Sequence, residues 1–397
     1  MKRHHNLKIS YFSFLFILVI VIVSCTHQPP RVNRSGLPQR EYSYQIPEKF
    51  ADGWETSSLE EEGVNLEKIA KLIEDILNEK YKNVHSVLLV ANGKLILEEY
   101  FYDFHRERPH QIRSATKSIN SILTGIAIDQ GLIEDVTEKT YPYLRSYEPP
   151  NGWDMRVRDV TIKSILSMTS GYDCDDFTTG HACELNMKNS DDWLMYAVSL
   201  PMAHEPGSYW AYNSVSPQLI EEIISEKSGI SFTDFSNKYL FEPLGITDFH
   251  WFLTPKGRTY VSGSARMRPR DMAKIGHLAL NKGKWKNTQI VSEQWIFEST
   301  KEHISPPVHS LLAKSSLGTC GYGYLWWTKD FSINKENIQS FFATGNGGQM
   351  IFVFPRLNLV AVFTQGNYNS SLANQPFDML TDYIIPAMLQ KPQVHKN

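Results

Sequence analysis

A serine and a lysine three residues apart, Ser114 and Lys117, are the residues of this chain best placed for nucleophilic chemistry. On a helix, this spacing puts the hydroxyl and the amine on one face, within reach of each other. Lysine can act as the base for a serine nucleophile when burial or a neighbouring cation lowers the pKa of its amine. A helix that starts at Ser114 would also offer free N–H groups to an oxyanion. The pair therefore predicts catalysis by an activated serine.

The same spacing occurs a second time, at Ser332 and Lys335, so the pattern alone is a weak signal. Residues 329–337 are polar and offer no apolar face on which a helix could be buried. Ser114 instead precedes apolar residues at helical spacing, namely Ile119, Ile122, Ile126 and their neighbours. We therefore favour Ser114 as the nucleophile. An N-cap serine with a solvated lysine one turn later is the alternative interpretation of the tetrad.

Two later clusters carry further candidate residues. Tyr212-Asn213-Ser214 lies just before an apolar pattern that predicts a helix over residues 217–227. Gly345-Asn346-Gly347-Gly348-Gln349 precedes a run rich in Val, Ile and Phe that predicts a strand over residues 350–354. A tyrosine that caps a helix and glycines that form a β-bulge would explain these clusters without any chemistry.

The remaining elements predict a single α+β domain. Apolar periodicity predicts helices over residues 65–77, 114–130, 160–168, 270–280 and 377–389. Residues 86–90 and 95–101 are β-rich and are joined by Asn92-Gly93, a pair typical of a tight hairpin turn. A second hairpin is expected over residues 350–354 and 359–364. We expect an antiparallel sheet formed by N- and C-terminal strands, flanked by helices as in an α/β sandwich, plus a helical region.

In this order, the three clusters resemble the motifs of the serine β-lactamase and penicillin-binding-protein superfamily. The closest likeness is to the branch of class C-like esterases, D-aminopeptidases and 6-aminohexanoate-dimer hydrolases. Ser114 to Lys117 matches the first motif, Tyr212-Asn213-Ser214 resembles the second, and the glycine-rich cluster at residues 345–349 resembles the third. Further similar stretches are TIKSILSMTSG (161–171), LFEPLGI (240–246), RDMAKIG (270–276) and YGYLWW (322–327). The resemblance extends from about Val64 to Leu389 and implies a β-lactamase/transpeptidase-like fold with its site in the cleft beside the helical region.

The resemblance also implies a role for each candidate residue. Ser114 attacks a carbonyl to form an acyl-enzyme, with Lys117 and Tyr212 as base and proton relay. Tyr212 can do this only if its pKa falls, and we expect the adjacent Lys117 to cause that fall. The backbone N–H groups of Ser114 and Gln349 hold the oxyanion. Substrate lies against the strand at a site formed by Ser214, Asn346, Gly347 and Gly348.

Two departures from the family pattern bear on the substrate. Asn346 stands where β-lactamases and transpeptidases carry lysine or histidine, so the cation that binds a substrate carboxylate is missing. This argues against an efficient β-lactamase or D,D-peptidase and favours an esterase or amidase for a less charged small molecule. Ser214 replaces asparagine and weakens the amide clamp on the substrate. The alternatives are a weak or inactive member acting as an envelope binding or scaffold protein, and a D-alanyl carboxypeptidase or β-lactamase.

The N-terminal sequence predicts that the protein is exported. Lys2, Arg3 and Lys8 precede an apolar run over residues 11–23 that is too short to span a membrane comfortably. The run ends just before Cys25 in a sequence that resembles the lipobox of bacterial lipoproteins, in which this cysteine is lipidated. A plain signal peptide or an uncleaved anchor is the alternative. We expect a lipoprotein signal peptide over residues 1–25, a flexible tether over 26–50 and the hydrolase domain over 51–392, membrane-anchored in the periplasm or at the cell surface.

Composition excludes several other classes of protein. With 40 Lys and Arg against 43 Asp and Glu, the chain lacks the basic excess of a nucleic-acid-binding protein. Its 13 histidines have no metal-ligand spacing, so we expect no metal or other cofactor. There is no Gly-x-Ser-x-Gly elbow, which sets aside the α/β-hydrolase fold.

Two cysteine and tryptophan features leave alternatives open. Cys174 and Cys183 flank a short segment after Gly171, and a disulfide and two free thiols are equally compatible with this spacing. Trp326-Trp327 fits core packing better than a pocket wall.

Overall fold

Strands from both ends of the chain pair into one sheet in the computed structural model, which describes residues 42–147, 149, 152–178, 182–307 and 320–389. All neighbouring pairs are antiparallel except β1 and β3, which are parallel. N-terminal β2 pairs with C-terminal β13, so the predicted α+β fold is confirmed. The strand order is β1 (Glu55–Thr56), β3 (Lys94–Tyr100), β2 (Val84–Ala91), β13 (Leu359–Gln365), β12 (Gln349–Phe354), β11 (Glu336–Gly345), β10 (Trp327–Ile333) and β9 (Gly321–Tyr322).

One hairpin has the turn that its sequence predicts, and another has a turn that its sequence does not predict. Asn92 and Gly93 have φ angles of 52° and 80°, as the predicted tight turn between β2 and β3 requires. The hairpin of β10 and β11 was not predicted, because its turn residues Asn334 and Lys335 include no glycine, although both have positive φ. The second Ser-x-x-Lys tetrad therefore lies on this hairpin and not on a helix, and its Ser332 is exposed.

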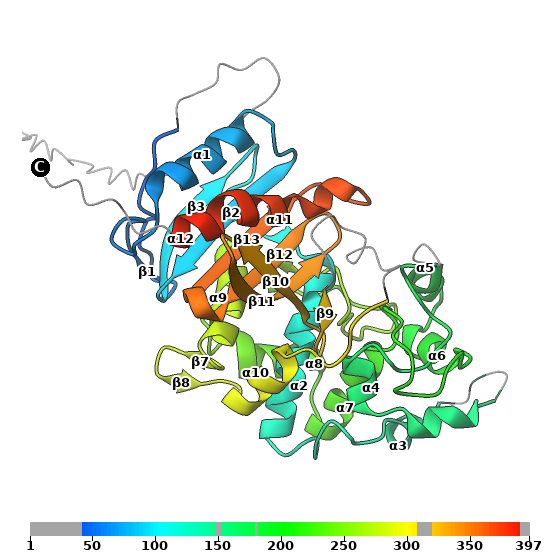
Figure 1. Cartoon of the computed structure of the whole chain (residues 1–397). Helices are drawn as coiled ribbons and strands as arrows, with labels where there is room; N and C mark the ends of the chain where they lie inside the picture. Colours follow the sequence, from blue (N-terminus) through cyan, green and yellow to red (C-terminus); the bar gives the residue numbers. More distant parts are fainter. Residues whose placement is uncertain (1–41, 148, 150–151, 179–181, 308–319, 390–397) are drawn as a thin grey trace, which may run out of the picture.

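Helices cover both faces of the sheet (Figure 1). On one face lie α1 (Leu66–Leu77), α11 (Gln375–Met379) and α12 (Ile385–Leu389), the last two joined by a π-turn over Leu380–Ile384. The Asn65 side chain caps α1 by accepting a hydrogen bond from the Lys68 N–H at 3.0 Å, as expected of this N-cap. On the other face, α9 (Pro269–Leu280) packs so closely that a Cβ at Gly276 would meet Val360 at 2.5 Å. The apolar stripes read from the sequence are thus buried against the sheet.

Helix α2 (Thr116–Asp129) runs between the sheet and a mainly helical region. It contacts β11 on one side and α7 and α10 on the other. Two small sheets, β4 (His110–Gln111) with β6 (Arg266–Met267) and β5 (Phe249–His250), and β7 (Lys284–Trp285) with β8 (Thr288–Gln289), complete the architecture. The other helices are α3 (Tyr141–Leu144), α4 (Ile162–Leu166), α5 (Ala182–Lys188), α6 (Trp193–Val198), α7 (Gln218–Ser228), α8 (Phe232–Ser236) and α10 (Glu293–Thr300).

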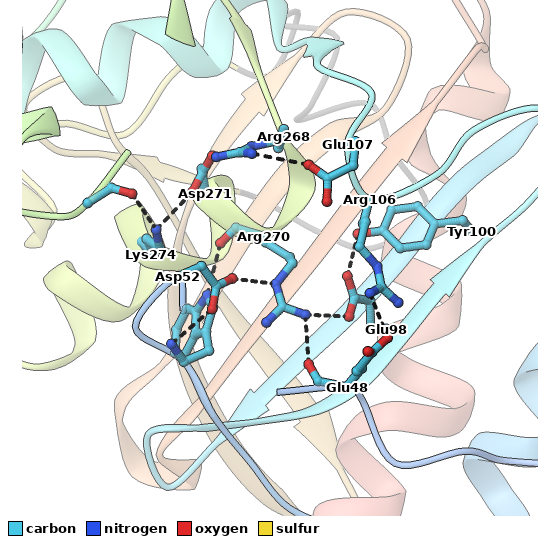
Figure 2. A network of polar contacts seen from close by, with 12 residues as sticks. Glu48, Asp52, Glu98, Tyr100, Arg106, Glu107, Arg268, Arg270, Asp271 and Lys274 are labelled. Atoms are coloured by element: carbon cyan, nitrogen blue, oxygen red, sulfur yellow. Dashed lines mark hydrogen bonds and ion pairs between the residues drawn. The ribbon is translucent and has the colours of Figure 1, made fainter. Parts of the chain in front are cut away.

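A buried ion network ties α9 to β3 and to the chain before β1 (Figure 2). Arg270, at the start of α9, donates to Asp52 at 2.7 Å and to Glu98 of β3 at 2.6 Å, and its side chain is only 6% exposed. One turn later, the fully buried Lys274 pairs with Asp271 at 3.0 Å. The charges of the RDMAKIG stretch are therefore structural, because each buried cation is paired with a carboxylate.

Residues 42–50, which the sequence predicts as the end of a flexible tether, lie against the domain. The Tyr44 hydroxyl donates to the Ile96 carbonyl at 2.8 Å, and the Tyr42 hydroxyl donates to Glu99 at 2.8 Å. The signal peptide, Cys25 and the tether up to residue 41 lie outside the described residues. Of the helices within the described ranges, none is both long and apolar enough to cross a membrane.

Candidate active site

Ser114 is presented at the junction of a tight turn and helix α2. It lies in the 3-10 turn Arg113–Ala115, and α2 begins two residues later at Thr116. Arg113 has a φ of 51°, an uncommon conformation for a residue other than glycine, and it turns the chain into the helix. The start of α2 therefore directs the positive end of its dipole and its free N–H groups toward Ser114.

Lys117 is buried directly below Ser114, at 1% exposure. Its Nζ lies 3.2 Å from Ser114 Oγ, 3.0 Å from Ser214 Oγ and 2.8 Å from the Ser262 carbonyl oxygen. Three acceptors satisfy the three donors of an ammonium group, whereas a neutral amine would donate to two of them and accept a proton from the third. The hydroxyls of Ser114 and Ser214 can both reverse in this way, whereas the Ser262 carbonyl can only accept.

Burial lowers the pKa of Lys117 from its ordinary 10.5 to about 8, although the negative charges of Glu184 and Asp176 act in the opposite direction. Desolvation disfavours the ammonium form, so a fraction of the amine is neutral near pH 7. This matches the requirement placed on a lysine base by the sequence.

Tyr212 lies over Lys117, with the amine 4.9 Å from the centre of the tyrosine ring. The ring stacks on Phe177 at 4.7 Å between centroids and contacts Trp210, Tyr322 and Trp327. Burial in this aromatic cluster raises the pKa of Tyr212, which only a side-chain hydrogen bond with Ser114 opposes. The expectation that Lys117 lowers this pKa is therefore wrong in direction, because desolvation of the phenolate dominates. Tyr212 therefore rests as a phenol, the form that carries a proton it could donate.

The glycine-rich cluster, residues 345–349, forms the side of the site that belongs to the sheet. A Cβ at Gly345 would lie 2.3 Å from the Ile112 carbonyl oxygen and 3.0 Å from the Ser114 nitrogen, so β11 can approach the nucleophile only with glycine there. Gly345 is the register partner of Gln349, whose backbone thus lies in the strand next to that contact. The Gln349 side chain points into the interior, where it donates to the Gln365 carbonyl at 2.6 Å. Gly347 and Gly348 have φ angles of 95° and 91°.

The candidate residues meet at one pocket between the sheet and the helical region. Ser114, Tyr212, Ser214 and Asn346 line it, as the sequence predicts for a shared site. Gly347 and Gly348 adjoin this group; a Cβ on them would meet Tyr368 at 2.6 Å and Gln365 at 2.8 Å. The sequence did not single out the other lining residues, which are Arg113, Glu184, Lys188, Gly263 and Ser264.

Glu184 and Lys188 enter the pocket from α5, and their carboxylate and amine are 2.5 Å apart. A disulfide between Cys174 and Cys183 anchors the start of this helix. Of the two alternatives left open by the sequence, the disulfide is therefore the one present, not two free thiols. The signal that could have led to Glu184 is its position directly after Cys183. Cys320 is a buried free thiol, and Trp326 and Trp327 are both buried, in line with core packing.

Comparisons with known proteins place this geometry in a family. The family model described as Beta-lactamase matches residues 69–380. A 6-aminohexanoate-dimer hydrolase from Paenarthrobacter ureafaciens is 22% identical over 309 residues, which cover 75% of this chain and 77% of that protein.

Solved structures share the fold. A family VIII carboxylesterase has a TM-score of 0.62 at 13% identity and covers 81% of this chain and 97% of its own. An octameric penicillin-binding protein homologue from Pyrococcus abyssi has a TM-score of 0.61 at 17% identity and covers 81% and 77%. The family match extends over the segment that carries Ser114, Lys117, Tyr212 and the glycine-rich strand. The chain therefore belongs to the Beta-lactamase family and is a serine hydrolase related to β-lactamases.

Proposed function

We propose that this protein cleaves an ester or amide through an acyl-enzyme on Ser114, with Lys117 as base and Tyr212 as proton donor. The observation that carries the proposal is the contact between the buried Lys117 amine and Ser114 Oγ at 3.2 Å, beneath a pocket that both Ser114 and Tyr212 line. A base within hydrogen-bond reach of the nucleophile is the first geometric requirement of this chemistry.

The proton path follows from the two perturbed groups. Neutral Lys117 takes the Ser114 proton as Oγ bonds to the carbonyl carbon. The Tyr212 phenol gives its proton to the leaving group as the acyl-enzyme forms, and the Lys117 ammonium, which lies 4.9 Å from the centre of the phenol ring, can then return a proton to the phenolate. Water then attacks the acyl group, and its proton passes back along the same path to release Ser114.

We expect a less charged acyl substrate rather than a β-lactam or a D-alanyl peptide. Asn346, which stands where the family resemblance implies a lysine or histidine, donates to Asn369 at 2.7 Å and carries no positive charge itself. The similar proteins named as a carboxylesterase and as a 6-aminohexanoate-dimer hydrolase support ester or amide bonds as the bonds cleaved.

Hydrolysis of p-nitrophenyl butyrate by residues 26–397 tests this proposal. Wild type, Ser114→Ala and Ser332→Ala are compared in parallel; Ser332 is a matched control because it stands in the second Ser-x-x-Lys tetrad but on an exposed hairpin. We expect activity to be lost only in Ser114→Ala. Activity that survives in Ser114→Ala would refute the assignment, and inactivity of all three would favour the binding or scaffold alternative.

We further propose that the chain is exported and tethered to a membrane through a lipid on Cys25. The charged and then apolar N-terminus that ends at Cys25 supports this proposal. Metabolic labelling with a radioactive fatty acid should label the full-length protein and not Cys25→Ala. Equal labelling of both proteins would contradict it.

A further inference from the structure

The two carboxylates that act on Lys117 both lie next to the disulfide. Glu184 directly follows Cys183, and Asp176 comes two residues after Cys174. Their negative charges oppose the effect of burial on the Lys117 amine. The disulfide holds the two cysteine Cα atoms 5.7 Å apart, so it keeps the two chain segments that carry these acids close together.

Buried polar side chains connect Glu184 to Lys117 through Ser214 and Tyr260. The Lys117 amine donates to Ser214 Oγ at 3.0 Å, and the Ser214 hydroxyl lies beside the Tyr260 phenol, where it acts to lower the pKa of that phenol. The Tyr260 hydroxyl in turn donates to Glu184 Oε1 at 2.7 Å. Lys117, Ser214 and Tyr260 are all at most 2% exposed, so little solvent screens this path.

All donors along this path can point the same way, from Lys117 toward the carboxylate. Such an arrangement polarises each bond in the direction that favours positive charge on the amine. Lys188, 2.5 Å from Glu184, has the opposite influence because it partly neutralises the carboxylate. The pair thus adjusts the negative potential at the base without contacting it.

We propose that Glu184, held by the Cys174–Cys183 disulfide and acting through Tyr260 and Ser214, is a positioning residue that stabilises the Lys117 ammonium formed when Ser114 loses its proton. This inference rests on the proposed function, since it assigns a role within the same site. Ser214 suits this role, because a hydroxyl can accept from the amine and donate to Tyr260 at once.

The sign of the effect follows from the charges that act on Lys117, which are those of Glu184 and Asp176, and from the neutral Tyr212 ring 4.9 Å from its amine. Removing the Glu184 charge makes the ammonium less favourable, so the base becomes neutral at lower pH. Removing the Lys188 charge strengthens Glu184 and moves the titration to higher pH.

The test is the pH dependence of Ser114 labelling by a fluorophosphonate, followed by mass spectrometry. Ser114 Oγ bonds to phosphorus, fluoride leaves and the proton goes to Lys117, so the labelling rate reports the base whatever the natural substrate. The labelling rate should rise with pH as Lys117 becomes neutral, and we call this rise the acidic limb of the pH profile. We expect Glu184→Gln and Tyr260→Phe to shift the acidic limb to lower pH by about half a pH unit, less than the roughly 1–3 units caused by a contacting charge. Lys188→Gln should move it up.

A merely structural role would lower the rate at every pH without moving the limb. An unmoved limb in Glu184→Gln and Tyr260→Phe, or movement of Glu184→Gln and Lys188→Gln in the same direction, would overturn the inference and leave the proposed function standing. Absence of label on Ser114 of the wild type at every pH would refute the proposed function, and the inference with it.

Discussion

The buried amine of Lys117 sets the pH range in which Ser114 should react. At its ordinary pKa of 10.5, about 0.03% of a lysine is neutral at pH 7; at the pKa of about 8 caused by burial, about 9% is neutral. Burial therefore raises the population of the competent base about 300-fold at pH 7. The neutral fraction rises further to about 50% at pH 8 and about 91% at pH 9. We expect kcat/KM to rise about tenfold between pH 7 and pH 9.

Initial rates of p-nitrophenyl butyrate hydrolysis across this pH range measure the effect, with Ser114→Ala rates subtracted for spontaneous hydrolysis. Lys117→Arg is the matched perturbation, because it keeps the positive charge beside Glu184 and Asp176 but cannot lose its proton. We expect it to lower kcat/KM by about 10²–10⁴, the usual contribution of a general base. A flat profile from pH 7 to pH 9, or Lys117→Arg with more than about a tenth of wild-type activity, would refute Lys117 as the base.

Three further perturbations test other parts of the structure. Tyr212→Phe should lower kcat about 10²-fold or more for an anilide and less for a p-nitrophenyl ester, whose leaving group needs no proton; equal losses would contradict proton donation by Tyr212. Arg270→Met should lower the free energy of unfolding in urea by about 3–5 kcal/mol, because it leaves the buried Glu98 carboxylate and the partly buried Asp52 carboxylate without their cation. Arg356→Met, which breaks an exposed pair, should cost less than about 1 kcal/mol, and similar losses in both would contradict this. Cys183→Ser should cost about 2–3 kcal/mol in the same assay, the loop-closure value for this short separation, and no change would show that the bond adds no stability.

Much of the fold could be predicted from local patterns. The apolar stripe after Asn65 and the Asn92-Gly93 turn each encode an element without reference to the rest of the chain, and α1 and the first hairpin lie where they predict. The hairpin of β10 and β11 escaped prediction because its turn uses Asn334 and Lys335 in a conformation that glycine usually takes.

Some residues of the site could be predicted from sequence motifs, and others could not. Ser114, Lys117 and Tyr212 carry motif signals, and the structure brings all three together. Glu184 and Tyr260 have no such signal, because their relation to Lys117 depends on hydrogen bonds between segments distant in sequence. The direction of the Tyr212 pKa could not be predicted either, since the aromatic cluster that buries its ring forms only in the folded chain.

The central claim is that Ser114 carries the acyl group during turnover. Its most direct test is to quench the reaction with p-nitrophenyl butyrate in acid within the first turnovers and to locate the butyryl group by peptide mass spectrometry. We expect one butyryl group on the peptide that contains Ser114, and none on that peptide in Ser114→Ala or on the peptide that contains Ser332. Release of p-nitrophenol by the wild type with the butyryl group on a residue other than Ser114 would contradict it.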